Sequence, residues 1–157
     1  AAKLLPLHPD AKFIFGGDGD IAAYENLARE LGVINSCRFL GWVTAEKKIK
    51  AYRDSSIYCL PSKNEGMPMS VLEAMSYGLA TISTPVGGVP QVISDGANGL
   101  LFPVDDIDAL TKILDQLMSD TALKERIGKN GRARIEEAFS LDAFLKQVKL
   151  IYGQVRG

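Results

Sequence analysis

Two glutamates stand in the segment with the most chemical potential in this sequence. Glu65 and Glu73 lie within residues 61–78, PSKNEGMPMSVLEAMSYG, with seven residues between them. The segment follows an apolar run at residues 57–60, turns through polar residues and enters an amphipathic pattern near Pro68. This pattern predicts that Glu65 lies in a loop and Glu73 about one turn inside a helix. Both carboxylates can then face one crevice and accept hydrogen bonds from hydroxyl groups of a ligand.

The start of the predicted helix is a second chemical feature of the same segment. First-turn amides lack partners within a helix and carry the positive end of its dipole, so they form a site for an anion such as phosphate. Pro68 suits the first helical turn, because its missing N–H is no loss there. The alternative interpretation is that Glu73 only stabilises the helix through the dipole and that Glu65 is a solvated loop acid.

Short apolar runs alternate with amphipathic segments along the chain. Strands are predicted at residues 11–16, 38–41, 56–60, 80–83 and 99–102, and helices at 21–31, 45–53, 69–78 and 90–94. This order predicts an α/β fold with a parallel sheet of about five strands and helices on both faces. Ligands of such sheets bind outside the carboxyl ends of the strands. Three further helices, the last opened by Ser140 as N-cap, are expected to form mostly a covering layer.

Composition narrows the class of protein. The length of 157 residues fits one domain, and a net charge of −1 without a basic stripe gives no support for nucleic-acid binding. No run reaches the length of apolar residues that a membrane span needs. Cys37 and Cys59 fall in apolar runs, which predicts two buried free thiols, no disulfide and a cytoplasmic origin.

The glycine-rich turn GGDGD at residues 16–20 has three interpretations. With Ala22 it fits the dinucleotide spacing G-x-G-x-x-A, but the next predicted strand does not end in the acid that this fingerprint expects. Its two acids form a D-x-D pair that can hold a divalent ion. The favoured interpretation is a tight turn that brings the backbone close to the ligand crevice.

His8 is the only histidine in the chain. It is expected to be a solvated loop residue, because it precedes the first predicted strand and lies far from the strand ends. Without another histidine, the chain offers no obvious base for a Ser-His-Asp arrangement and no ligand set for a histidine-containing zinc site.

The frame around the two glutamates resembles a known family. Residues 61–106 are similar to the donor-binding half of the retaining glycosyltransferases of the family 4 type, which have the two-domain GT-B architecture. The resemblance includes the E-x7-E pair, the LEAM helix, the VGG turn at residues 86–88 and the DGANG turn that leads to LLFP. The tail FSLDAFLKQVKLIY resembles the family's closing helix, which often crosses back to the partner domain.

The resemblance implies a role for each matching residue. Glu65 is the implied catalytic residue and contacts the hydroxyls of the donor sugar, while Glu73 holds the ribose. The turn of Gly41, Trp42 and Val43 lines the base pocket, with Trp42 at its rim, whereas Gly87 and Gly88 supply turn geometry more than ligand contact. The implied donor-binding set is Gly17, Gly41, Trp42, Val43, Glu65, Gly66, Met67, Pro68, Met69 and Glu73.

The implied activity is sugar transfer from a UDP- or GDP-linked donor to an acceptor with retention of configuration, in polysaccharide or glycolipid biosynthesis. The resemblance implies no metal and no cofactor. Residues 1–157 would be the Rossmann-like donor domain, without the family domain's first strand and its Arg and Lys, and without the N-terminal acceptor domain. The fragment alone is therefore expected to be inactive. The missing half would choose the acceptor and mediate any association with the inner face of the membrane.

Two residues depart from the family pattern, and other functions stay open. Pro68 stands where many relatives have Gly, which removes one amide donor to phosphate, and Gln91 stands where an acid is frequent. A sugar-nucleotide epimerase or a phosphorylase of related architecture is one alternative. A non-catalytic partner subunit is the other.

Overall fold

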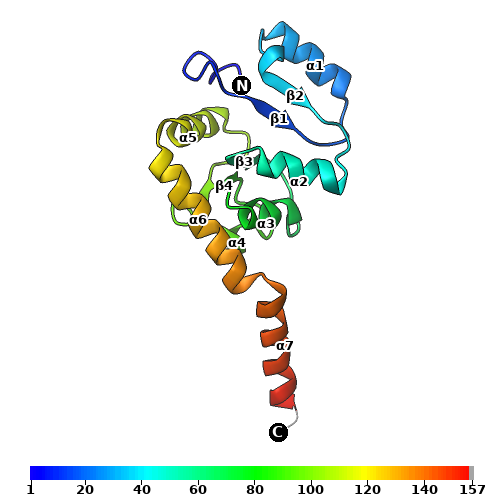
Figure 1. The fold of residues 1–157 in the computed structure, drawn as a ribbon, viewed down its shortest axis with the longest axis vertical. Coiled ribbons are helices and arrows are strands. Elements are labelled where there is room, and N and C mark those ends of the chain that lie inside the picture. The colour runs from blue at the N-terminus through cyan, green and yellow to red at the C-terminus, as the bar shows by residue number, and fades with distance from the viewer. Residues whose placement is uncertain (156–157) are drawn as a thin grey trace.

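The predicted alternation of strands and helices is present in the computed structural model, which describes residues 1–155 (Figure 1). The strands are β1 (Phe13–Phe15), β2 (Cys37–Phe39), β3 (Ile57–Leu60), β4 (Ala80–Ser83) and β5 (Leu100–Leu101). The helices are α1 (Ile21–Glu30), the 3-10 turn η1 (Ile34–Ser36), α2 (Ala45–Arg53), α3 (Met69–Ser76), α4 (Val89–Val92), α5 (Ile107–Ser119), α6 (Thr121–Ala138) and α7 (Leu141–Val155).

The five strands form two parallel sheets, which corrects the expectation of a single sheet. β1 pairs with β2, and β3, β4 and β5 pair in that order. Phe13 is opposite Cys37 in the first sheet, and Ile57 is opposite Ala80 in the second. The helix α2 carries the chain from one sheet to the other. Within residues 1–155, no strand hydrogen-bonds to both sheets.

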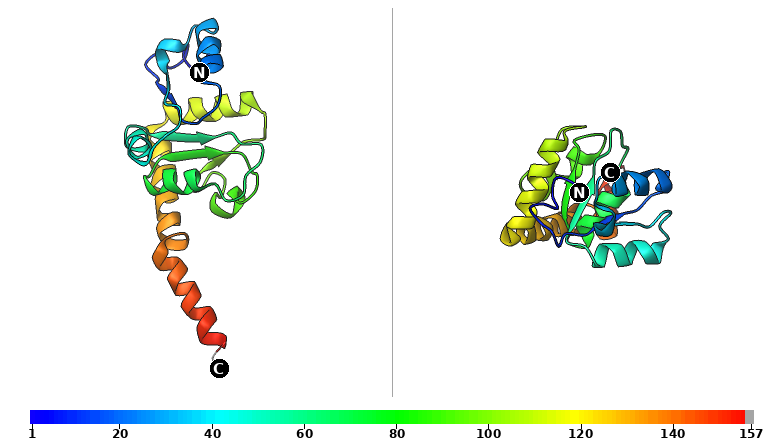
Figure 2. Two further views of the ribbon diagram at one scale, coloured as in Figure 1. Left: turned by 90° about the vertical axis from the view of Figure 1, so that its right-hand side faces the viewer. Right: turned by 90° about the horizontal axis from the view of Figure 1, so that it is seen from above.

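The second sheet is covered on both faces, as predicted. All four residues of β4 are buried. On one face Val71 and Met75 of α3 pack with Val89 of α4, and on the other Ile82 packs with Leu117 of α5 and Ile127 of α6. Figure 2 shows α3 and α5 on opposite sides of β3 and β4. Burial on both faces fits the continuous apolar sequence of β3, IYCL, whereas β4, ATIS, also buries the polar residues Thr81 and Ser83.

The segment before β1 is tied to α5, so the expectation of a solvated His8 is wrong. The His8 Nε2 atom lies 2.7 Å from the Asp115 carboxylate, and the His8 side chain is mostly buried. Lys3 also forms an ion pair with Asp108 at the start of α5. Contacts between residues more than 100 positions apart leave no local sequence signal, which is why the pattern did not reveal them.

The C-terminal helices begin at side-chain caps. The Asp106 carboxylate accepts from the Ala109 amide at 2.8 Å, and the Ser140 hydroxyl accepts from the Ala143 amide at 3.1 Å, which confirms the predicted cap at Ser140. The helices α5 and α6 cover the sheet, but α7 projects away from it (Figures 1 and 2). The expectation of a covering layer is therefore wrong for α7, whose Leu141 is 72% exposed.

Both cysteines are free thiols. Burial raises the pKa of the Cys37 thiol and raises that of Cys59 to about 12. Among the helices of the part of the chain that the structure describes, none is long and apolar enough to cross a membrane.

Candidate functional site

The turns that follow β1 and β2 touch through their backbones. The Gly17 amide donates to the Gly41 carbonyl at 3.0 Å. Gly41 has a φ of 65°, a left-handed conformation that favours glycine. A Cβ atom at Gly16 would lie 2.8 Å from a Val43 methyl carbon. This close approach supports the tight-turn interpretation of the glycine-rich segment, and it leaves Trp42 73% exposed beside the contact.

Asp20 has a structural role that the sequence interpretation missed. Its carboxylate accepts from the Ala23 amide at 3.0 Å and so caps α1. The signal was an acid directly before an apolar-periodic segment. Within residues 1–155, no group of three or more His, Cys, Asp or Glu side chains is arranged to hold a metal ion.

A cavity of about 500 Å³ opens between α1 and the β1–β2 sheet. Its lining is mainly apolar and includes Phe15, Ile21 and Leu27, with Gly17 and Gly41 at one side. Neither Glu65 nor Glu73 lines it. The cavity therefore touches the first two turns of the candidate site but not its carboxylates.

Glu65 lies in the loop that leaves the carboxyl end of β3. The Ser62 hydroxyl donates to Glu65 Oε1 at 2.6 Å. The Thr84 hydroxyl, which follows β4, donates in turn to the Ser62 carbonyl. These bonds hold Glu65, which is partly buried, through its Oε1 atom.

The VGG turn after β4 packs directly under this loop. The Gly88 amide donates to the Gly66 carbonyl at 2.6 Å. Gly87 has a φ of 55°, and a Cβ atom there would lie 1.9 Å from the Glu65 carbonyl oxygen. The geometry agrees with the interpretation of Gly87 and Gly88 as turn residues. Because these two residues lack side chains, the loop after β3 and the turn after β4 can pack against each other.

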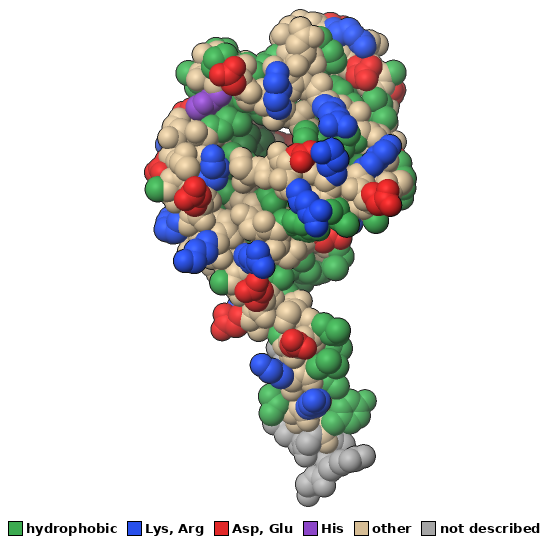
Figure 3. Space-filling view, viewed as in Figure 1, with side chains coloured by type: hydrophobic (Ala, Val, Ile, Leu, Met, Phe, Trp, Pro, Cys, Tyr) green, Lys and Arg blue, Asp and Glu red, His purple; other side chains and the backbone are tan. Residues whose placement is uncertain are grey.

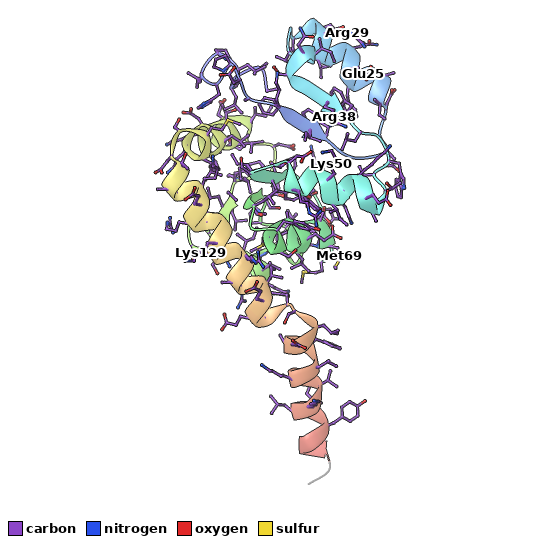
Figure 4. All side chains as sticks on the ribbon, viewed as in Figure 1. Glu25, Arg29, Arg38, Lys50, Met69 and Lys129 are labelled. Atoms are coloured by element: carbon purple, nitrogen blue, oxygen red, sulfur yellow. The ribbon has the colours of Figure 1, made fainter. Side chains whose placement is uncertain are left out.

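The helix α3 begins at Met69, as predicted, and Pro68 occupies the N-cap position directly before its first turn. Pro68 offers no side-chain cap, and the amides of Met69 and Ser70 open the helix. Met69 is 62% exposed at this start, where Figure 4 labels it. Gly66 and Met67 are also exposed and directly precede this start.

Glu73 lies about one turn inside α3, as predicted, and is bound by two side chains of α2. The Lys48 ammonium donates to Oε1 at 2.7 Å, and the Tyr52 hydroxyl donates to Oε2 at 3.1 Å. Burial raises the pKa of the Tyr52 hydroxyl, and the nearby Tyr58 and Glu73 raise it further, so this hydroxyl stays a neutral donor. Sequence reasoning missed both partners, although their spacing of four residues on α2 places them on one face.

Basic side chains line a groove on the other side of α2. The groove has a volume of about 280 Å³ and includes Arg38, Lys47 and Lys50. Figure 4 labels Arg38 and Lys50, and Figure 3 shows Lys and Arg side chains gathered around a hollow on this face. Lys50 forms an ion pair with Asp54 at 2.8 Å, so it does not share the contact of Lys48 with Glu73.

The structure brings the predicted residues together in two groups. The turns of β1 and β2 join Gly17 to Gly41, whereas the loops of β3 and β4 join Glu65 and Gly66 to the VGG turn. The helix α2 connects these groups, since it follows the Val43 turn and its Lys48 reaches Glu73. Along the chain, the start of α3 with its first-turn amides lies between Glu65 and Glu73.

The chain belongs to the glycosyl transferases group 1 family, whose model matches residues 1–134. An uncharacterized glycosyltransferase of Methanocaldococcus jannaschii is 30% identical over 151 residues, which are 96% of this chain and 38% of that relative. The chain thus spans well under half the length of this relative.

Solved structures give the same class. The C-terminal domain of a glycosyl transferase group 1 family protein from Francisella tularensis superimposes with a TM-score of 0.80 at 28% identity, over 90% of this chain and 76% of that one. Anabaena HepE in complex with UDP superimposes with a TM-score of 0.83 at 20% identity, over 93% of this chain and 42% of that one, and shows the fold alone. The α/β fold of this chain is that of GT-B glycosyltransferase domains.

Proposed function

We propose that this chain is the donor-binding half of a glycosyltransferase of the family 4 type, which transfers a sugar from a nucleoside diphosphate sugar with retention of configuration. One observation carries the proposal. Glu65 and Glu73 flank the amide-rich start of α3 at the carboxyl ends of β3 and β4, where ligands of parallel sheets bind.

Each part of the donor has a complementary group in this proposal. The diphosphate lies at the amides of Met69 and Ser70, where the helix dipole favours negative charge. The transferred sugar donates hydroxyl hydrogens to Glu65, whose Oε1 is already held by Ser62 at 2.6 Å. Glu73 accepts from the ribose, and the turn of Gly41 to Val43 borders the base. The remaining predicted residues, Gly17, Gly66, Met67 and Pro68, bring the backbone close to the donor.

Charge stabilisation of the departing diphosphate is the main catalytic demand. The α3 amides meet part of it, and the proposal assigns the rest to cations outside this chain. An acceptor domain outside the chain completes the cleft and excludes water. The chain alone is therefore expected to transfer no sugar.

Binding of nucleotides tests the donor site. The full-length protein would be titrated with UDP, GDP and ADP by calorimetry, with UDP first because HepE was solved with it. Binding of one nucleoside diphosphate is expected, and Glu73→Gln should weaken it. Lack of binding by all three would overturn the proposal.

Activity tests the role of Glu65. With the matching nucleotide sugar, Glu65→Gln should lower kcat about tenfold to 100-fold, because a positioned hydrogen bond to the reacting sugar is lost. NMR of the product should show the anomeric configuration of the donor. An epimerised nucleotide sugar as product, or full activity of both Glu65→Ala and Glu73→Ala, would favour the epimerase or the non-catalytic alternative.

A further inference from the structure

Lys48 and Tyr52 approach Glu73 from one face of α2. The Lys48 Nζ atom is 2.7 Å from Oε1, and the Tyr52 hydroxyl is 3.1 Å from Oε2, so each carboxylate oxygen has one protein donor. The Tyr52 hydroxyl also lies 3.4 Å from the Ser70 carbonyl oxygen in the first turn of α3. The two side chains therefore fix the carboxylate and link α2 to the start of α3.

The remaining acceptor capacity of Glu73 matches a vicinal diol. An ionised carboxylate has about four lone-pair directions, two on each oxygen. Lys48 and Tyr52 occupy one on each oxygen, which leaves one on each for donors from outside the protein. The Glu73 side chain is 33% exposed, so Lys48 and Tyr52 do not seal it from solvent. Two adjacent hydroxyl groups can then bind the two oxygens side by side.

Tyr52 is held in place by its surroundings. The residue is only 7% exposed. Its ring packs edge-on against Tyr58 at 5.9 Å and tilted against Tyr77 at 5.4 Å between centroids. A donor fixed in this way lowers the entropy that the Glu73 side chain loses when a ligand binds.

Lys48 has a second effect, on charge. Glu73 lies on the helix whose start would bind the diphosphate, and an unpaired carboxylate there would repel the ligand. The Lys48 ammonium balances this charge at 2.7 Å. Its side chain is 41% exposed, so salt should weaken its contribution.

We infer that Lys48 and Tyr52 are positioning residues that hold Glu73 as a two-oxygen acceptor for the ribose diol of the donor. The inference rests on the proposed function, because it assigns no new ligand. It adds specificity for a ribose that carries both hydroxyl groups.

The first test removes only the tyrosine hydroxyl. Binding of the nucleoside diphosphate selected above, and of its 2′,3′-dideoxy counterpart, would be measured by calorimetry for the full-length protein, Tyr52→Phe and Tyr77→Phe. Tyr52→Phe should weaken binding of the diol ligand about threefold to tenfold, and that of the dideoxy ligand less than about twofold. Tyr77→Phe should bind both like the wild type. Equal losses for both ligands, or no loss for the diol ligand, would overturn the role of Tyr52.

The second test removes the ammonium. Lys48→Met should weaken binding of the diol ligand more than that of the dideoxy ligand, and Lys48→Arg should restore part of the loss. Lys50→Met is the matched control, since it removes the same charge from the same helix but breaks the pair with Asp54. Equal effects of Lys48→Met and Lys50→Met would show that only net charge matters and would overturn the role of Lys48.

Glu73→Gln distinguishes the ribose assignment of Glu73 from the positioning role of Lys48 and Tyr52. If this change leaves diol binding intact, the ribose assignment of the proposed function fails. If it weakens diol binding while Tyr52→Phe and Lys48→Met do not, the positioning role alone fails. When Glu73→Gln is already present, adding Tyr52→Phe should weaken binding of the diol ligand little further, because the two residues act as a unit.

Discussion

Gly87 packs so closely against Glu65 that a Cβ atom at Gly87 would lie 1.9 Å from the Glu65 carbonyl oxygen. Gly87→Ala should therefore displace the Glu65 loop and also strain a φ of 55°. We expect a loss of about 2 kcal/mol or more in the free energy of unfolding. The loss of sugar transfer should be larger than this stability change explains. Chemical denaturation and steady-state kinetics of the full-length protein measure the two effects.

Gly96→Ala is the matched control for this change. Gly96 has a similar φ of 74°, but a Cβ atom there would meet nothing within 4 Å. Gly96→Ala should lower the free energy of unfolding by about 1 kcal/mol from backbone strain alone and leave sugar transfer intact. If both variants lose the same stability and activity, contact between the two loops is not what requires glycine at Gly87.

Gly128 allows α6 to lie against the turn after α3. A Cβ atom at Gly128 would come within 2.1 Å of the Gly78 carbonyl oxygen. Gly128→Ala should destabilise the protein by about 2 kcal/mol, although alanine favours a helix by about 1 kcal/mol over glycine. Lys129→Ala, at the exposed next residue labelled in Figure 4, should change stability by less than about 0.5 kcal/mol. Equal denaturation midpoints for the two variants would contradict the close approach.

Local patterns predicted the order of elements because periodicity and caps act over a few residues. The continuous apolar run of β3 predicted that strand, and the residue type of Ser140 before a helical pattern predicted the cap. Glu65 also lies in a loop and Glu73 one turn inside a helix, as predicted, because these placements depend on local sequence alone.

Long-range placement accounts for what the sequence did not predict. The contact of His8 with Asp115 spans 107 positions, and that of Lys48 with Glu73 spans 25, so each depends on how helices cross the sheet. The division into two sheets depends on which strand edges meet. The projection of α7 depends on packing partners, because its apolar residues predict burial without saying against what.

Burial of Cys59 makes stability sensitive to alkaline pH. Its pKa rises from an ordinary value of 9.0 to about 12, because the thiolate is poorly solvated in the fold. The thiol ionises at lower pH in the unfolded chain than in the fold. The contribution of Cys59 to the free energy of unfolding is therefore full below pH 9 and is lost as the pH rises from 9 toward 12. Tyr52 and Tyr58, whose pKa values are also raised mainly by burial, add to this loss above pH 10.

Thermal unfolding under reducing conditions measures this effect. Ionisation of Cys59 should leave the melting temperature unchanged from pH 7.5 to about 8.5 and lower it steeply above about pH 9. Cys59→Ala should melt lower at neutral pH, because it leaves a small cavity, but its melting temperature should fall less between about pH 9 and 10. Identical pH profiles would exclude Cys59 as a source of the alkaline loss.

Trp42 gives a direct optical signal from the turn after β2. It is the only tryptophan of this 157-residue chain and is 73% exposed, so the difference between the emission of the full-length protein and that of Trp42→Phe reports this position. If this turn borders the base, a saturating nucleoside diphosphate should quench or blue-shift the emission, because the base displaces water from the indole. Inorganic diphosphate should bind at the start of α3 without changing the tryptophan emission.

Trp42→Phe should leave the melting temperature unchanged and weaken nucleotide binding less than about threefold, as a rim contact would. Nucleotide binding that is visible by calorimetry but leaves the emission unchanged would place the base elsewhere.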